Sequence, residues 1–119
     1  MILYHRTNTA AAGVILRRGF RDRAGIYGTT VRSAGVWFSD EPLDANEGAP
    51  GTVLLRVALR INRREMDPHE WREASKPYRE WQLPAELVNS RAASVRVVHQ
   101  WQEAGLPPPR RLRLRKAGA

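Results

Sequence analysis

The segment at residues 52–61 constrains the fold most, because it is apolar on both faces of an extended strand. Its sequence, TVLLRVALRI, places aliphatic side chains at consecutive positions rather than at alternating ones. A strand that buries both of its faces belongs in the interior of a sheet, with other strands beside it. The chain is therefore predicted to build a sheet around this central strand.

Other segments supply the rest of the predicted elements. Further strands are predicted from β-favouring or alternating residues at 2–7, 35–39, 78–83 and 93–99. One helix has a clear local signal, with Asn8 or Thr9 as its N-cap, apolar residues at 12–16 and Gly19 at its C-terminal end. Residues 21–34 and 40–51 are predicted loops, and 63–76 contains a short helix. Several short strands with one early helix indicate an α+β domain on an antiparallel or mixed sheet.

Length and composition exclude several classes of protein. A chain of 119 residues can bury one core but not two. It has no cysteine, which excludes disulfide scaffolds, thiolate zinc sites, iron–sulfur clusters and cysteine nucleophiles. The hydrophobic fraction of 42% excludes wholesale disorder. The sequence has neither a run long enough to span a bilayer nor a secretory signal, so we expect a cytoplasmic protein without a membrane partner.

The positive charge is concentrated at the C-terminal end. The formal net charge is +8, and five basic residues fall within residues 110–116. Without those five, the rest of the chain carries only +3. We therefore predict one domain at residues 1–106 and an extended, unpacked Pro/Arg-rich tail at 107–119. Such a tail can bind phosphates, lipid headgroups or an acidic protein, or serve only as a soluble end.

Common catalytic and metal-binding motifs are missing from the sequence. The histidines at 5, 69 and 99 lack metal-ligand spacing, the glycines at 25 and 28 match no phosphate-binding loop, and no serine lies in a nucleophile-elbow motif. Two polar residues on predicted strands remain. His5 shares a strand face with Leu3 and Thr7, and Glu80 lies inside an apolar strand. A carboxylate in that setting is paired, exposed on one face, or functional.

Five segments in a fixed order add a more specific signal. They are His5-Arg6-Thr7, Ile15-Leu16-Arg17-Arg18-Gly19-Phe20, Gly35-Val36-Trp37-Phe38-Ser39-Asp40, Val53-Leu54-Leu55-Arg56-Val57-Ala58-Leu59, and Arg79-Glu80-Trp81 followed by Val88-Asn89. Between residues 2 and 98 this order resembles the ADP-ribosyltransferase fold of the poly(ADP-ribose) polymerase and diphtheria-toxin class. The corresponding family patterns are H-G-[ST], I-L-x-x-G-L, G-I-Y-F-A-D, I-L-L-x-E-V-A-L, and N-E-Y with a later V-N.

The resemblance implies both a fold and an activity. The fold would be a small domain of two packed antiparallel or mixed sheets with one N-terminal helix. The activity would be mono-ADP-ribosyl transfer or NAD glycohydrolysis, with NAD as the co-substrate and no metal, as in a bacterial toxin or modification enzyme. The acceptor stays open between a nucleic acid, a protein, a small molecule and water. An antitoxin or immunity protein would be a fitting partner.

The resemblance also implies roles for individual residues. Glu80 would contact the nicotinamide ribose and stabilise the oxocarbenium-like transition state, and His5 would bind the adenosine ribose at the pocket floor. Trp37 would stack on nicotinamide. The other expected NAD-contacting residues are Arg6, Thr7, Tyr27, Phe38 and Ser39. Arg6 stands where the family has glycine and could reach the pyrophosphate, and Tyr27 could replace an aromatic residue that is missing from 44–51.

Two other functions fit parts of the sequence. An RNA 2′-phosphotransferase shares the fold and would use arginines such as Arg6, Arg17 and Arg18 around a phosphate, although it has no evident use for Glu80. A catalytically inactive module that binds ADP-ribose or nucleic acid would account for Arg6 and for the missing second aromatic residue.

Overall fold

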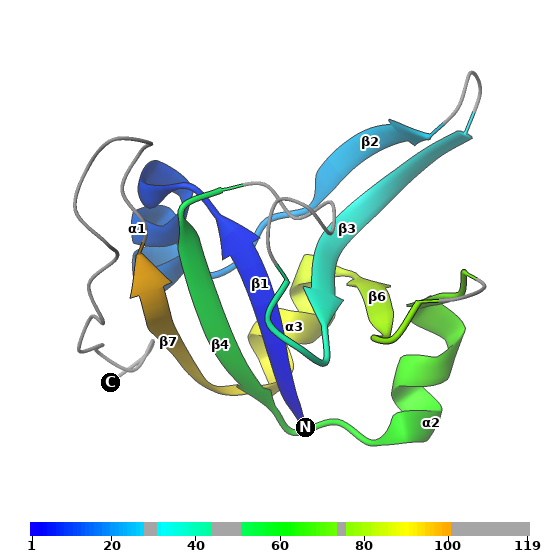
Figure 1. The fold of residues 1–119 in the computed structure, drawn as a ribbon. Helices are drawn as coiled ribbons and strands as arrows, with labels where there is room; N and C mark the ends of the chain where they lie inside the picture. The colour runs from blue at the N-terminus through cyan, green and yellow to red at the C-terminus, as the bar shows by residue number, and fades with distance from the viewer. Residues whose placement is uncertain (28–30, 44–50, 74–75, 101–119) are drawn as a thin grey trace.

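A computed structural model describes residues 1–27, 31–43, 51–73 and 76–100 of the chain. The described residues form seven strands, three α-helices and one 3₁₀ helix (Figure 1). In chain order these are β1 (Ile2–Thr7), α1 (Thr9–Arg18), β2 (Arg23–Tyr27), β3 (Val31–Ser39), β4 (Val53–Leu59), α2 (Arg63–Met66), η2 (Asp67–His69), β5 (Glu70–Trp71), β6 (Glu80–Leu83), α3 (Ala85–Arg91) and β7 (Ala92–Gln100). The predicted tail at 107–119 lies outside the described residues.

The strands form one antiparallel sheet. Six of them follow the order β5-β6-β3-β1-β4-β7, and β2 pairs with the first half of β3. The predicted α+β class and the N-terminal helix are confirmed. The expectation of two packed sheets is wrong, because β1 pairs with β4 on one side and with β3 on the other and so joins the strands into a single sheet. The loop predicted at 21–34 is also wrong, because β2 and β3 pair there as a hairpin.

The strand predicted from 52–61 occupies the interior of the sheet. β4 pairs with β1 in an unbroken register from Ile2 opposite Ala58 to Thr7 opposite Val53, and with β7 on its other side. Its side chains are buried on both faces at Leu54 and Leu55. The consecutive aliphatic residues of β4 are thus explained by burial on both sides.

One face of the sheet packs against helices α1 and α3. Ala12 and Ile15 of α1 and Val88 of α3 are buried in one cluster with Leu3 and Leu55. Figure 1 shows both helices behind the sheet formed by β1, β4 and β7. Among the described residues, no helix has the length and apolarity needed to cross a membrane.

The two ends of α1 match their sequence signals. The Asn8 side chain accepts a hydrogen bond from the Ala11 N–H at 2.8 Å, and Gly19 ends the helix with a φ of 89°. A side chain at Gly19 would also collide with Asn89, since an added Cβ would lie 2.7 Å from its Oδ1. Glycine is therefore required there by both the backbone conformation and the packing.

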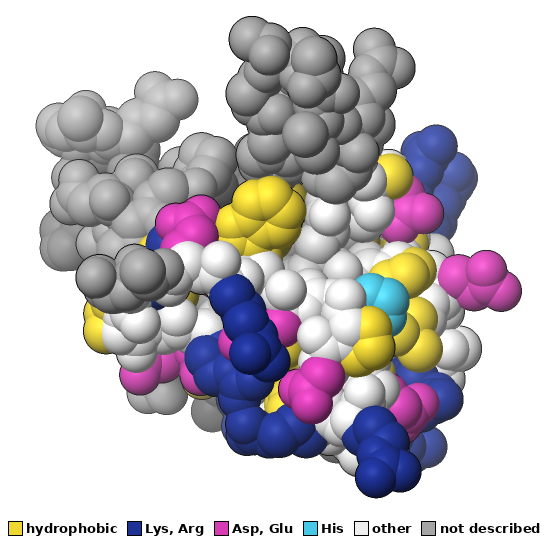
Figure 2. Space-filling model, turned by 90° about the vertical axis from the view of Figure 1, so that its right-hand side faces the viewer, with side chains coloured by type: hydrophobic (Ala, Val, Ile, Leu, Met, Phe, Trp, Pro, Cys, Tyr) yellow, Lys and Arg dark blue, Asp and Glu magenta, His cyan; other side chains and the backbone are white. Residues whose placement is uncertain are grey.

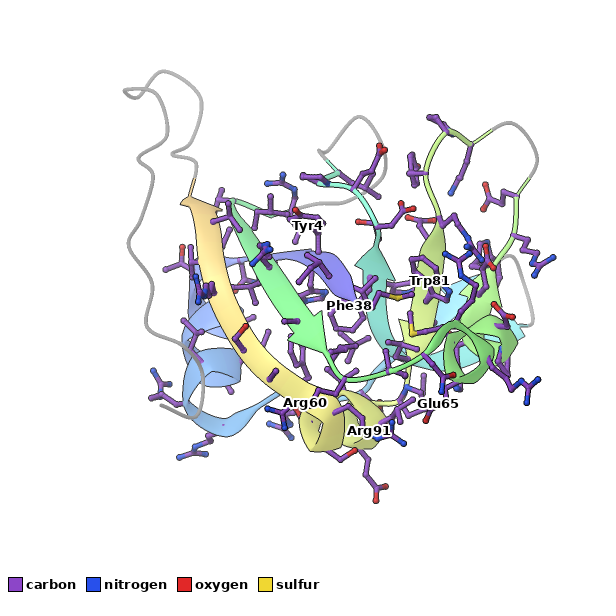
Figure 3. All side chains as sticks on the ribbon, turned by 90° about the horizontal axis from the view of Figure 1, so that it is seen from below. Tyr4, Phe38, Arg60, Glu65, Trp81 and Arg91 are labelled. Atoms are coloured by element: carbon purple, nitrogen blue, oxygen red, sulfur yellow. The ribbon has the colours of Figure 1, made fainter. Side chains whose placement is uncertain are left out.

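The N-terminus of helix α3 has no capping side chain next to it in the sequence and is capped by Asp22 instead. Pro84 precedes it and makes no side-chain cap, while the Ala85 N–H donates to Asp22 Oδ1 at 2.7 Å. At the other end, Arg91 pairs with Glu65 at 2.7 Å and donates to the Arg60 carbonyl. Figure 3 labels these three residues in the same region of the molecule. Because these partners lie far away in the chain, local sequence signals did not predict this helix.

A partly buried ion pair links β5 to Arg79, the residue before β6. The Glu70 side chain is only 8% exposed and accepts hydrogen bonds from Nε and Nη2 of Arg79. The Arg79 guanidinium also lies 5.2 Å from the ring centre of Trp81. Hydrogen bonding to Arg79 is the main reason that the pKa of Glu70 is lowered. The region of β5 and β6 is thus held together by a bidentate, charge-assisted contact.

Replacing Glu70 by glutamine is expected to lower the free energy of unfolding by about 1–3 kcal/mol at neutral pH. A carboxylate with a lowered pKa stabilises the fold fully above its usual value of 4.5 and loses this contribution as the pH falls through the lowered pKa. The difference between Glu70→Gln and wild type should therefore shrink in acid. Urea unfolding at neutral and acidic pH measures it, with Glu86→Gln, an exposed helix position, as the control. An equal difference at both pH values would contradict a stabilising role of the ionised Glu70 carboxylate.

Candidate functional site

The sheet opens between β1 and β3. These two strands share a single register pair, Tyr4 with Ser39, and separate beyond it. Each keeps its pairing on the outer side, β1 with β4 and β3 with β6. A pocket of about 870 Å³ lies at this opening. Its volume is within the range of cofactor and small-ligand sites.

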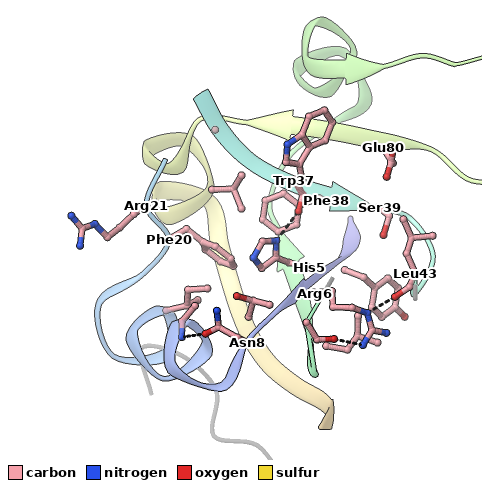
Figure 4. A pocket seen from close by; sticks show the side chains of 18 of the residues that line it. His5, Arg6, Asn8, Phe20, Arg21, Trp37, Phe38, Ser39, Leu43 and Glu80 are labelled. Atoms are coloured by element: carbon pink, nitrogen blue, oxygen red, sulfur yellow. Dashed lines mark hydrogen bonds between the residues drawn. The ribbon is translucent and has the colours of Figure 1, made fainter. Parts of the chain in front are cut away.

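Most of the residues expected to contact NAD line this pocket (Figure 4). They are His5, Arg6 and Thr7 from β1, Trp37, Phe38 and Ser39 from β3, and Glu80 from β6. The prediction for Tyr27 concerns a side chain outside the described part of the structure, although its backbone ends β2. Segments separated by up to 75 positions in the chain thus meet at one pocket, because β1, β3 and β6 are neighbours in the sheet.

His5 links the two strands where they separate. Its Nδ1 lies 2.7 Å from the Trp37 carbonyl oxygen, which can only accept, so Nδ1 carries the proton and donates. The ring packs against Phe20 and Phe38 with ring centres 5.5 and 5.6 Å apart. In the neutral form of the ring, Nε2 is then the acceptor.

Asn89 holds Phe20 in contact with His5. Its amide group receives the Phe20 N–H at 2.8 Å and donates to the Phe20 carbonyl at 2.9 Å. Phe20 in turn packs on Phe38 with ring centres 5.4 Å apart. The role of Asn89 as a clamp was missed by the sequence analysis, since its partner is 69 positions away.

Trp37 and Trp71 form an aromatic edge on one side of the pocket. Trp37 is half-buried, and its ring meets that of Trp71 nearly at right angles with centres 5.5 Å apart. The Trp71 side chain is 37% exposed although it is large and apolar. The sequence analysis did not name Trp71 as a site residue. Its signal is a tryptophan among charged residues, in the run EWRE.

Glu80 belongs to a group of charged side chains at the pocket. Lys76 Nζ lies 2.9 Å from one oxygen of Glu80 and 3.2 Å from one of Glu73. The Trp71 Nε1–H donates to Glu73 at 2.9 Å. The bond to Glu80 and then that to Glu73 raise the pKa of Lys76, and the bonds from Trp71 and Lys76 lower the pKa of Glu73. With two carboxylates and one ammonium, the group keeps one net negative charge.

Arg6 lines the pocket but directs its guanidinium toward backbone carbonyls. Nε donates to the Leu43 carbonyl, and Nη1 reaches the Gly51 carbonyl at 3.5 Å. Gly51 lies close against the Thr7 backbone, where a Cβ would not fit. Arg6 thus links residues 43 and 51 to β1 through hydrogen bonds. The expected reach of Arg6 toward a pyrophosphate stays a prediction.

The remaining predicted residues are walls of the pocket. Phe38 is 2% exposed, Ser39 and Thr7 are also buried, and the Ser39 hydroxyl donates to the Glu41 carbonyl at 2.6 Å. Within the described residues, no three histidine, aspartate or glutamate side chains gather as the ligands of a metal ion would.

Comparisons of the chain with protein-family models, curated proteins and solved structures gave no match.

Proposed function

We propose that this protein is a NAD-dependent ADP-ribosyltransferase that cleaves the bond between nicotinamide and ribose. The observation that carries the proposal is the meeting of His5, Trp37 and Glu80 from three strands in one pocket. These are the residues to which the sequence resemblance assigns the floor, the stacking face and the carboxylate of the site. The rest of the argument follows from the chemistry that each group offers.

The reaction needs a carboxylate and a flat apolar face. When the C1′–N bond breaks, its electron pair goes to the nicotinamide nitrogen and positive charge develops at C1′ of the ribose. Glu80 on β6 supplies a fixed negative charge for that carbon. The half-buried indole of Trp37 offers a face for the departing ring, which a stacking contact holds in place. The acceptor, water included, then bonds to C1′ and gives up a proton.

His5 suits the binding of a ribose hydroxyl. Since Nδ1 donates to the Trp37 carbonyl, Nε2 of the neutral ring is an acceptor, for which a sugar hydroxyl is a matching donor. The contacts with Phe20 and Phe38 fix the plane of the ring. A preoriented acceptor binds with a smaller loss of conformational entropy than a mobile one.

The phosphotransferase alternative receives less support. Of the three arginines considered for it, Arg6 lines the pocket and is bonded to carbonyls, whereas Arg17 and Arg18 are not among the lining residues. Of the arginines considered for this alternative, the described structure thus brings only Arg6 to the pocket. Glu80 also has no evident role in a site that binds only a phosphate.

Nicotinamide release from NAD by the purified protein tests the proposal. We expect release by the wild type, in the absence of any added acceptor if water can serve. If no release occurs, calorimetry with NAD separates the alternatives: binding without turnover indicates that an acceptor or partner is missing, and absence of binding favours the inactive module or the phosphotransferase.

A further inference from the structure

The face of β1, β4 and β7 that points away from α1 and α3 carries arginines and no acidic side chain. Tyr4 lies opposite Arg56, and Arg56 lies opposite Arg96, so the three side chains form one row across the strands. Side chains alternate between the faces of a strand, and the alternate set, with Leu3 and Val57, is buried toward the helices. The sequences of β1, β4 and β7 contain no aspartate or glutamate.

The two arginines are placed at a cost to stability. Like charges directly opposite each other on adjacent strands repel. In the part of the chain that the structure describes, neither Arg56 nor Arg96 makes an ion pair. Elsewhere acidic and basic side chains are interspersed, as on the face in Figure 2, and Arg79 and Arg91 each have a carboxylate partner. An anionic ligand would relieve the repulsion between Arg56 and Arg96.

We infer that this face binds a single-stranded nucleic acid. Half-buried Tyr4 offers a ring on which a base can stack, and the two guanidinium groups offer partners for consecutive phosphates. Leu54 on this face is buried, but Tyr4, Arg56 and Arg96 are not covered by the helices, and this part of the sheet suits a single strand, whose bases can be splayed on it, better than a duplex (Figure 1). The chain also continues beyond β7 toward the five basic residues at 110–116.

The row of side chains leads to the pocket. Tyr4 lies opposite Ser39, and Ser39 lies opposite Glu80, so the register carries the row from Arg96 to Glu80. Three strand spacings separate Arg56 from Glu80, or about 14 Å. A strand bound along this row would bring one of its nucleotides to the carboxylate. The nucleic acid would then be the ADP-ribose acceptor, a conclusion that rests on the proposed function, whereas the binding itself does not.

Fluorescence anisotropy with a fluorescein-labelled oligothymidylate, over a series of salt concentrations and without NAD, tests the binding. We expect Arg56→Gln/Arg96→Gln to weaken binding roughly tenfold at low salt and to make the slope of log K against log salt shallower by about 1.4, the value for two lost phosphate contacts. Arg63→Gln/Arg64→Gln removes the same charge from exposed positions of α2 and should leave the slope unchanged. Tyr4→Leu should weaken binding at an unchanged slope.

Three results would overturn the inference: no binding by the wild type at low salt, equal effects of the two double variants, or an Arg56/Arg96-dependent affinity for polyglutamate that oligothymidylate does not share. The last result would identify an acidic protein as the partner. Thermal unfolding of each variant verifies that it is folded. Because NAD is left out, failure of nicotinamide release does not affect this measurement, and binding without release would reject the proposed function alone.

Discussion

Replacing Glu80 by glutamine is expected to lower the rate of nicotinamide release by roughly 10²–10³-fold, the usual loss when one preorganised electrostatic group is removed from an active site. Glutamine keeps the shape of the side chain and removes its charge, so the developing positive charge at C1′ loses its fixed partner. The fold should persist, because the backbone of β6 keeps its pairing with β3 and β5. The steady-state rate of nicotinamide release, together with the thermal unfolding midpoint, provides the measurement.

Glu73→Gln is the matched control for this variant. Glu73 shares Lys76 with Glu80, but its side chain is 50% exposed, compared with 18% for Glu80. It lines the same pocket, and its replacement by glutamine removes the same formal charge. We expect only a few-fold loss of rate, since exposed charges are screened by solvent. Full activity in folded Glu80→Gln protein, or equal losses in the two variants, would remove Glu80 from the mechanism.

Replacing Phe38 by alanine is expected to cause a large loss of stability, about 3–5 kcal/mol. Phe38 is 2% exposed and packs on His5 and Phe20 beneath the pocket. Its removal leaves a cavity between β3 and the helices, which the surrounding side chains fill only in part. The thermal unfolding midpoint should fall by more than about 10 °C.

Phe38→Leu separates the loss of volume from the loss of the aromatic contacts. Leucine fills most of the space, so we expect a cost of about 1–1.5 kcal/mol. This variant should remain folded, which allows NAD binding to be measured with the His5 ring less constrained. An unfolding midpoint of Phe38→Ala close to that of wild type would show that the contacts among Phe38, His5 and Phe20 do not support the fold.

Elements with a complete local signal were predictable from the sequence. β4 was predictable because its aliphatic residues are consecutive, and α1 because Asn8 and Gly19 mark its ends. β2 and α3 were not, since β2 depends on pairing with β3, and the first N–H of α3 depends on Asp22, 63 positions away. A sequence pattern reports such partners only when they are local.

The candidate site was likewise predictable from the sequence only in part. The resemblance of five segments pointed to His5, Trp37 and Glu80, which line one pocket in the structure. The sequence analysis did not find the bridge made by Lys76 between two carboxylates, nor the clamp of Asn89 on Phe20. Both depend on the directions of side chains on segments joined by turns, and these directions follow from the tertiary packing.

The sequence by itself determined β1, β4, β7 and helix α1, where polar residues fall on them, and that the chain has one α+β core. Only the tertiary structure decided that all strands join in a single sheet and that this sheet opens between β1 and β3. The physical reason is that strand order and register come from hydrogen bonds between distant segments. The single pair of Tyr4 with Ser39 leaves no trace in either segment's own pattern.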